Sequence, residues 1–230
     1  MKRAGEKKSN KLGVIIAALV AVVVVVCGFL FFNPFGGKAS HTAKKAGTSG
    51  SSSSTQAVKY EPSQEEKDYL KNRFAQLTAV NPEAIAYVYA PGTELDEPVV
   101  QTGDNATYLD KTFDGGNEPY MGTVFMDTDN KKDFSDRLTW LFGHHRMFND
   151  VNYYDKQEYF DQHPYVVIET PERKYYYEAM CLVIVPETTA FYRTSFEDDK
   201  DFTTQLKKVY EDGQTKNPNI KSKASDKYLV

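Results

Sequence analysis

Cysteine and histidine are both scarce in this chain. The 230 residues contain two cysteines and four histidines. Cys27 and Cys181 each lie inside an apolar run, so neither is expected to form half of a disulfide, and a hydrophobic core must hold the fold. The sequence has no HExxH or Cys-x-x-Cys pattern, and a zinc site needs three or four converging ligands. No metal or organic cofactor is therefore expected.

Positive charge is also in short supply after the first quarter of the chain. From Lys59 onward there are 31 Asp and Glu residues against 20 Lys and Arg residues, a surplus of 11 negative charges. Phosphate binding depends on clustered Lys and Arg side chains. Nucleic acid is therefore excluded as an expected partner.

One long apolar run stands near the N-terminus. Residues 12–32, LGVIIAALVAVVVVVCGFLFF, carry no charge. At a helical rise of about 1.5 Å per residue, this run is long enough to cross a hydrocarbon layer of roughly 30 Å. A cleaved signal peptide is the alternative, but its apolar region is normally shorter and is followed by small residues, whereas bulky residues follow here. We expect a transmembrane signal-anchor with the lipid bilayer as a partner.

The segments on either side of this run set the expected orientation. Residues 1–11 carry five basic side chains and one acidic one, so the positive-inside rule predicts a cytoplasmic tail. Residues 33–58 are rich in Gly, Ser and Thr and predict a flexible linker. Residues 59–230 are then a single domain on the extracellular face of the cell membrane.

Helical periodicity appears twice in this domain. Ser63 followed by Glu66 is a capping-box pattern, and apolar residues recur at helical spacing behind it, which predicts an N-terminal helix over residues 64–77. Asn81 and the proline after it should end this helix. Residues 202–212, FTTQLKKVYED, predict a second, long helix.

The rest of the domain has the pattern of short strands separated by turn residues. The expected strands cover residues 84–90, 98–101, 121–127, 137–145, 164–170, 174–186 and 227–230. Seven strands spaced in this way favour a closed or nearly closed β-barrel over a parallel sheet. The predicted fold is mainly β, with the second helix inserted before the last strand.

Two adjacent histidines occur in residues 139–150, TWLFGHHRMFND. In an extended strand, alternate side chains share a face, so Trp140, Phe142 and His144 should lie together and His145 on the other face. The two histidines therefore do not serve one site. For His144 alone, a hydrogen-bonded structural role is the alternative to a catalytic one.

The segment that begins at Asp127, DTDNKKDFSDRL, has some of the features of a calcium loop. It has Lys131 and Lys132 where a ligand and the turn glycine belong, and Leu138 where the closing glutamate belongs. Calcium binding is therefore not expected at this loop.

Several motifs together resemble the class B sortases, the membrane-anchored cysteine transpeptidases of Gram-positive cell surfaces. The resemblance runs from about residue 85 to residue 230. It rests on AIAYVYAPGTELDEPVVQTGDNATYL, on MGTVFMDTDN, and on WLFGHHRMFNDVNYYDKQEYFDQHPYVVI. The last motif is the most specific, because Gly-His, Met-Phe, a Tyr-rich helix and a His-Pro step occur together.

The resemblance implies a sortase-like closed β-barrel with seven of the eight strands present. It also implies that a cysteine thiolate cleaves a C-terminal sorting signal after Thr and forms a thioacyl intermediate. The implied partners are secreted proteins that bear sorting signals, and a cell-wall peptidoglycan or pilin amine that accepts the acyl group. His144 matches the catalytic histidine. The implied substrate-binding residues are Asn105, Leu109, Phe142, Thr188 and Tyr192.

The chain departs from the family pattern at its C-terminal end. In the family, the nucleophilic cysteine and a catalytic arginine follow a strand whose beginning resembles SDKYLV, so both are expected beyond Val230. Cys181 should be a buried packing residue, because burial raises the pKa of a thiol. One interpretation is an active enzyme truncated before its cysteine; the other is a non-catalytic relative that binds sorting signals or cell-wall peptides. In either case, residues 227–230 should form an open sheet edge.

Overall fold

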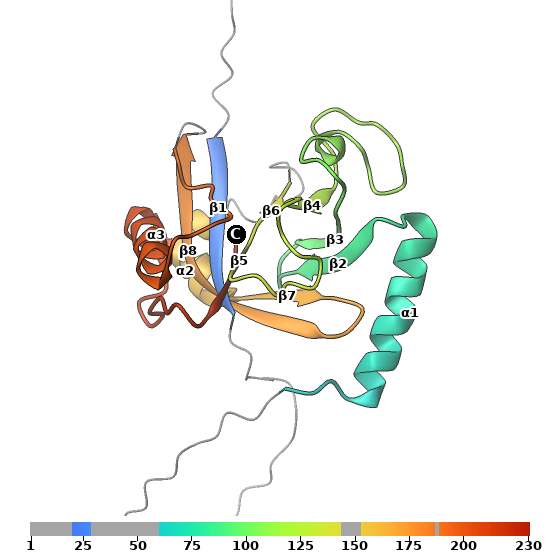
Figure 1. Ribbon diagram of the computed structural model, residues 1–230, viewed down its shortest axis with the longest axis horizontal. Coiled ribbons are helices and arrows are strands. Elements are labelled where there is room, and N and C mark those ends of the chain that lie inside the picture. The colour runs from blue at the N-terminus through green and yellow to red at the C-terminus, as the bar shows by residue number, and fades with distance from the viewer. Residues whose placement is uncertain (1–19, 29–59, 144–152, 187–188) are drawn as a thin grey trace, which may run out of the picture.

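The computed structural model describes residues 20–28, 60–143, 153–186 and 189–230, and it has a mainly β fold (Figure 1). Its helical elements are α1 (Gln64–Val80), the 3-10 turn η1 (Thr107–Leu109), α2 (Gln157–Gln162) and α3 (Asp199–Asp212). Its strands are β1 (Val20–Gly28), β2 (Ala84–Tyr89), β3 (Asp96–Val100), β4 (Val124–Met126), β5 (Leu138–Thr139), β6 (Leu141–Phe142), β7 (Tyr165–Glu169), β8 (Lys174–Pro186), β9 (Thr215–Lys216) and β10 (Lys227–Leu229).

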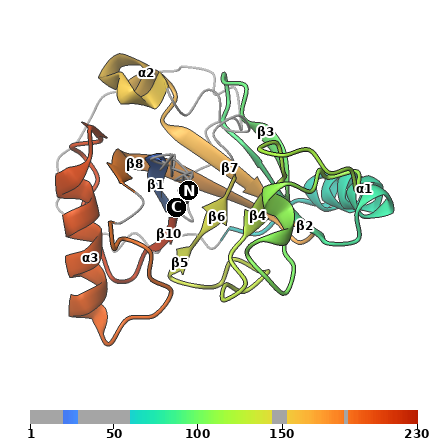
Figure 2. The same ribbon diagram turned by 90° about the horizontal axis from the view of Figure 1, so that it is seen from above.

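All the described strands belong to one curled sheet. Its strand order is β5-β10-β1-β8-β7-β2-β3-β4-β6, with β9 added on β8. β5 and β6 are separated only by Trp140, so one short segment pairs with β10 through its first half and with β4 through its second half. Seen from above, the strands lie between α1 on one side and α3 on the other (Figure 2). The mainly β prediction is therefore confirmed.

The core has two main parts that share β8. Tyr177, Ala179 and Leu182 belong to the cluster in the interior of the curled sheet. Met180 and Cys181, on the same strand, belong to the cluster that includes buried residues of α3. A strand buried on both faces has an almost continuously apolar sequence. This explains why residues 179–185 are apolar without alternation.

The N-terminal helix forms where the sequence predicts it. The Ser63 side chain accepts a hydrogen bond from the backbone N–H of Glu66, at 3.1 Å, as expected of a helix cap. α1 runs to Val80, three residues beyond the predicted end, and Asn81 is its C-cap. Leu70 and Phe74 are buried beneath it.

A buried ion-pair network also attaches α1 to the sheet. Glu169 on β7 has a side chain that is only 1% exposed. It contacts Arg73 of α1 at 2.9 Å and Lys174 of β8 at 2.6 Å. A buried carboxylate without such partners would be costly. The sequence analysis did not identify this network.

The inserted helix α3 begins three residues earlier than predicted. Asp198 caps it by accepting a hydrogen bond from the backbone N–H of Asp201, at 2.7 Å. Asp199 and Asp201 in the first turn favour the helix because negative charge there complements the helix dipole. Phe202, with Leu206 and Val209 behind it, is buried against the sheet.

Residues 20–28 differ from the sequence prediction. They form strand β1 instead of part of a membrane-spanning helix over 12–32, and they pair antiparallel with β8 on one side and β10 on the other. Valine is β-branched and fits strands well, and the neighbouring strands satisfy the backbone groups that a helix would satisfy internally. Among the residues described, no helix is long and apolar enough to span a bilayer.

The prediction of an open edge at residues 227–230 is wrong for this structure. β10 pairs parallel with β5 on one side, with Tyr228 opposite Leu138. On its other side it pairs with β1, with Tyr228 opposite Cys27. The prediction assumed that only a strand after residue 230 could pair with this edge. In the structure, the N-terminal valine run forms that neighbouring strand, β1.

Candidate functional site

Three aromatic side chains gather beside the end of β6. The rings of Trp140 and Phe142 are stacked, with centroids 6.4 Å apart and an angle of 14° between their planes. Tyr192 contacts both, with centroid distances of 5.3 Å to Trp140 and 6.0 Å to Phe142. The predicted alternation along this segment is therefore confirmed for Trp140 and Phe142. β6 ends two residues before His144.

Asp127 joins this aromatic group to a second chain segment. The residue is completely buried at the end of β4. Its Oδ2 accepts hydrogen bonds from the Tyr192 hydroxyl at 2.6 Å and from the Asn105 amide at 2.9 Å. Its Oδ1 accepts from the backbone N–H of Asp129 at 2.8 Å. We refer to Asn105, Asp127, Trp140, Phe142 and Tyr192 as the Asp127 cluster.

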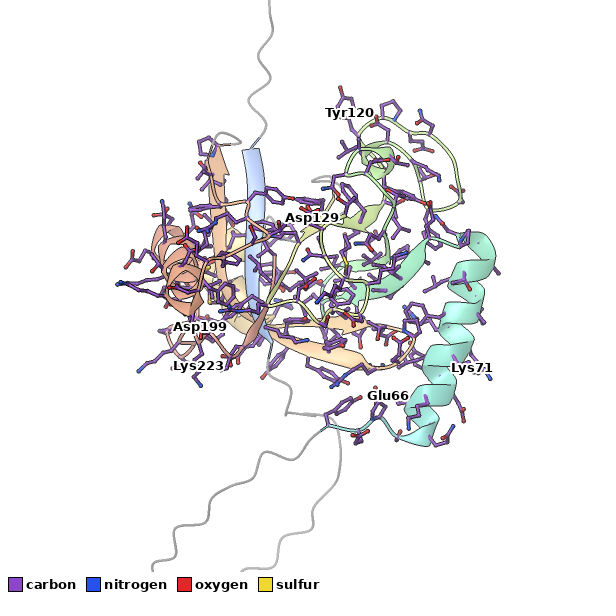
Figure 3. All side chains as sticks on the ribbon, in the orientation of Figure 1. Glu66, Lys71, Tyr120, Asp129, Asp199 and Lys223 are labelled. Carbon is purple, nitrogen blue, oxygen red and sulfur yellow. The ribbon has the colours of Figure 1, made fainter. Side chains whose placement is uncertain are left out.

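The electrostatics of this cluster are those of a carboxylate held by neutral donors. None of the ion pairs between described residues involves Asp127. Partial burial and the hydrogen bond to Asp127 raise the pKa of Tyr192 above its usual value, so its hydroxyl remains a donor at neutral pH. Figure 3 labels Asp129, whose backbone N–H donates to Asp127.

Buried amides fix the loop that carries Asp127. The Gln101 side chain donates to the carbonyl oxygens of Asp127 at 2.6 Å and of Asn130 at 2.7 Å. The Asn130 side chain in turn accepts from the backbone N–H of Trp140 at 2.8 Å. The Trp140 indole donates to the carbonyl of Arg193 at 2.8 Å, which ties the segment that carries Tyr192 to β6. Both sides of the cluster are thus connected to the sheet.

Leu109 lies on a neighbouring surface. It is 39% exposed at the end of η1. Gly122, with φ +45°, lies directly against the carbonyl oxygens of Tyr108 and Leu109, where a Cβ atom would clash. This glycine therefore allows the chain before β4 to approach η1 closely and sets the position of Leu109.

The structure describes four of the six predicted site residues. It brings Asn105, Phe142 and Tyr192 together in one cluster and puts Leu109 on the same connection as Asn105, between β3 and β4. His144 and Thr188 lie outside the described residues. The sequence analysis did not identify Asp127 as a site residue. An acidic residue directly after an apolar strand was the available signal, but it was considered only as a calcium ligand.

Cys181 has the predicted packing role. It is completely buried on β8, and burial raises the pKa of its thiol to about 12. Arg193 pairs with Asp201 through two contacts, at 2.9 Å and 2.5 Å. Arg137 pairs with Asp199 at 3.0 Å. Both arginines are thus engaged in ion pairs with the first turn of α3.

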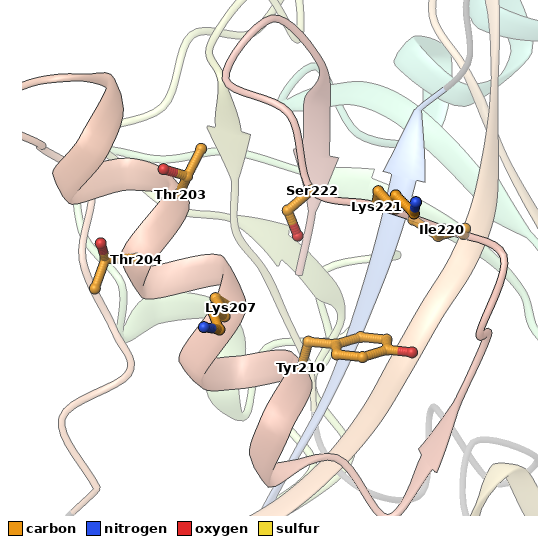
Figure 4. A pocket seen from close by; sticks show the side chains of 7 residues that line it. All are labelled: Thr203, Thr204, Lys207, Tyr210, Ile220, Lys221 and Ser222. Carbon is orange, nitrogen blue, oxygen red and sulfur yellow. The ribbon is translucent and has the colours of Figure 1, made fainter.

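A pocket of about 370 Å³ lies elsewhere, between α3 and the chain that leads to β10 (Figure 4). Its lining combines hydroxyl, lysine and apolar side chains and contains none of the predicted site residues: Thr203, Thr204, Lys207, Tyr210, Ile220, Lys221 and Ser222. In the described part of the chain, no group of three or more His, Cys, Asp or Glu residues is arranged to hold a metal ion.

Two curated proteins are similar to this chain in sequence. Sortase B of Staphylococcus aureus is 26% identical over 140 residues, which cover 59% of this chain and 57% of that protein. Sortase B of Listeria monocytogenes is 26% identical over 167 residues, which cover 70% of this chain and 66% of that protein. The chain thus spans less than two thirds of the length of either relative. No protein-family model matches it.

Solved structures show the same fold. A Staphylococcus aureus sortase B–substrate complex superposes with a TM-score of 0.65 at 24% identity, covering 69% of this chain and 74% of that one. Sortase B from Bacillus anthracis in complex with AAEK1 superposes with a TM-score of 0.62 at 26% identity, covering 68% of this chain and 75% of that one. In sequence and in fold, the chain is thus similar to the class B sortases.

Proposed function

We propose that this protein is a cysteine transpeptidase for the sorting signals of secreted proteins, and that the Asp127 cluster lines its sorting-signal groove. The observation that carries the proposal is the convergence of Asn105, Phe142 and Tyr192, three residues from distant parts of the sequence, around one buried carboxylate. Aromatic rings beside amide and hydroxyl donors suit an extended peptide, whose backbone needs polar partners and whose side chains need apolar surface.

In the proposed reaction, a cysteine thiolate attacks the carbonyl carbon of the Thr residue in the sorting signal. The new C–S bond forms a thioester, and the peptide C–N bond breaks as His144 donates a proton to the leaving amine. His144 then takes a proton from the acceptor amine, which attacks the thioester and releases the thiolate. The acceptor is an amine of cell-wall peptidoglycan or of a pilin.

The protein also has a proposed location, on the outer face of the cell membrane with residues 12–32 as its single span. The length of the uncharged run and the five basic residues before it support this location. The pairing of β1 with β8 and β10 is a different arrangement of the same residues. One copy of the segment cannot adopt both, so their relative stability is a measurable property of the chain.

A second candidate function is binding without turnover. It is favoured by the state of Cys181, whose burial and raised pKa make it unsuitable as the nucleophile. On this alternative, the protein holds sorting signals or cell-wall peptides at the membrane surface.

Two measurements separate these functions. If the reading frame continues past codon 230 with a Thr-Cys pair and a following arginine, the transpeptidase is supported; if no thiol is encoded there, only binding is left. In the longer protein, His144→Ala should abolish transfer of a labelled sorting peptide to an amine, whereas Cys181→Ala should leave transfer unchanged. Unchanged transfer in the His144 variant would contradict the catalytic assignment.

A further inference from the structure

The Asp127 carboxylate is in an unusual position for a completely buried acid. Among the described residues it pairs with no cation, and two uncharged side chains donate to it, one from earlier and one from later in the chain. Asn105 comes from the connection after β3, and Tyr192 from the connection after β8. Both donate to the same oxygen atom, Oδ2. One atom thus connects two segments separated by 87 positions in the sequence.

We propose that Asp127 is a positioning residue, which fixes the Asn105 amide and the Tyr192 ring so that the two form a preorganised recognition surface for the peptide backbone. The proposal rests on the proposed function of the cluster as a sorting-signal groove. Asp127 itself is completely buried, so it acts through the two residues that it holds rather than through contact with the peptide.

The contacts of Asn105 show what the fixed side chain offers. Its Oδ1 accepts from the backbone N–H of Thr128 at 3.0 Å, and one hydrogen of its Nδ2 goes to Asp127 at 2.9 Å. The amide plane is therefore set at both ends. The second Nδ2 hydrogen has no acceptor among the described residues, so it can donate to a peptide carbonyl without reorientation of the side chain.

Tyr192 is held in a comparable way. It is 49% exposed, so its ring would be free to leave the surface if its hydroxyl were not tied to Asp127 at 2.6 Å. With the hydroxyl fixed, the ring stays against Trp140 and Phe142. Hydrogen bonds to a charged acceptor are stronger than neutral ones, so a carboxylate suits this role better than an amide.

Asp127→Asn tests the proposal because it keeps the shape but changes one atom from acceptor to donor. The new amide can keep its oxygen toward the N–H of Asp129 and its NH2 toward the position of Oδ2. Tyr192 can then accept from this NH2, because a hydroxyl both donates and accepts. The Asn105 Nδ2 cannot accept, so only this residue should be released.

The measurement is the affinity of the full 230-residue chain, in detergent micelles, for the members of a library of fluorescent hexapeptides that each contain an internal Thr. Asp127→Asn should weaken binding about tenfold, or about 1.4 kcal/mol. In an Asn105→Ala background, the same substitution should have no further effect, because the contact that it disrupts is already absent. A general structural defect would weaken both backgrounds equally, and that result would overturn the proposal.

Asp136→Asn is the matched control. Asp136 lies in the same loop and accepts from the Asn130 side chain at 3.2 Å and from the Lys131 N–H at 2.6 Å, but it does not contact Asn105 or Tyr192. It should leave peptide affinity unchanged. Tyr192→Phe removes the other hydrogen bond to Asp127, the one from the Tyr192 hydroxyl. It tests the proposal even if Asp127→Asn folds poorly, and it should also weaken binding.

A structural readout separates failure of this proposal from failure of the proposed function. The side-chain NH2 signals of Asn105 in a ¹H–¹⁵N spectrum should move to the shifts of a free amide in Asp127→Asn and should stay in place in Asp136→Asn. If the wild type binds none of the peptides, the proposed function fails while this readout still decides whether Asp127 positions Asn105. Unchanged Asn105 signals in Asp127→Asn would overturn the positioning role.

Discussion

Val26→Pro tests whether β1 belongs to the folded domain. Val26 is paired with Leu229 of β10 and, directly after a shift in register between Val25 and Val26, with Ala179 of β8. Proline has no N–H and fits poorly between two paired strands, so we expect it to remove a ladder hydrogen bond and leave a carbonyl without its donor.

The expected size of the effect follows from these two losses. A lost hydrogen bond and an unsatisfied buried carbonyl together cost about 3 kcal/mol. For a domain of this size, each kcal/mol lowers the Tm by about 2 to 4 °C. The Tm of the domain should therefore fall by about 6 to 12 °C, as measured by scanning calorimetry. Hydrogen exchange at the amides of β8 and β10 should become faster in the same variant.

Val26→Thr is the matched control, because threonine keeps both the N–H and the β-branched shape. If residues 12–32 form a membrane helix instead, proline is tolerated because neighbouring groups and local adjustments satisfy the freed backbone. The domain would then melt at the same temperature in both variants. A Tm difference of less than about 2 °C between the proline and threonine variants would refute the pairing of β1 in solution.

Three further predictions follow from single residues. Glu169→Ala should lower the free energy of unfolding by about 3 kcal/mol in urea titrations, because it leaves Arg73 and Lys174 partly buried without their counter-ion; a loss below about 1 kcal/mol would contradict a structural role for the network. Gly122→Ala should displace η1 and reduce both the Tm and peptide affinity, since the added Cβ meets two carbonyl oxygens at a positive φ, and normal values for both would show that the close approach is unimportant. In a Cys27→Ser background, Cys181 should not react with a thiol reagent at pH 8 until the protein is unfolded, because its pKa is raised to about 12 and its sulfur is buried; rapid labelling of the native protein would disprove its burial.

Local patterns in the sequence predicted local structure well. The capping residue Ser63 and the apolar spacing after it located α1, and alternation from Trp140 to Phe142 correctly put their rings on one face. Both signals arise from backbone geometry within a few residues, where a helix or strand repeats regularly. The ends were less accurate, since α1 extends to Val80 and α3 begins at Asp199.

Such local patterns could not predict the long-range contacts within the candidate site. The resemblance to class B sortases named Asn105, Phe142 and Tyr192, but not the buried Asp127 that connects two of them. Nothing in the residues beside Asp127 indicates that its partners lie 22 positions before it and 65 positions after it. The role of the Asp127 carboxylate can therefore be inferred only once the structure shows which side chains donate to it.

The N-terminal run shows the difference between sequence and tertiary structure most directly. Its composition by itself determines that residues 12–32 avoid water, because they carry no charge and consist mostly of large apolar side chains. Composition cannot choose between a helix in a bilayer and a strand in a sheet, since either arrangement can give backbone N–H and C=O groups hydrogen-bond partners. Only the tertiary structure shows that β8 and β10 lie on either side of residues 20–28 and can pair with them as a strand, because these partners are about 150 to 200 positions away in the sequence.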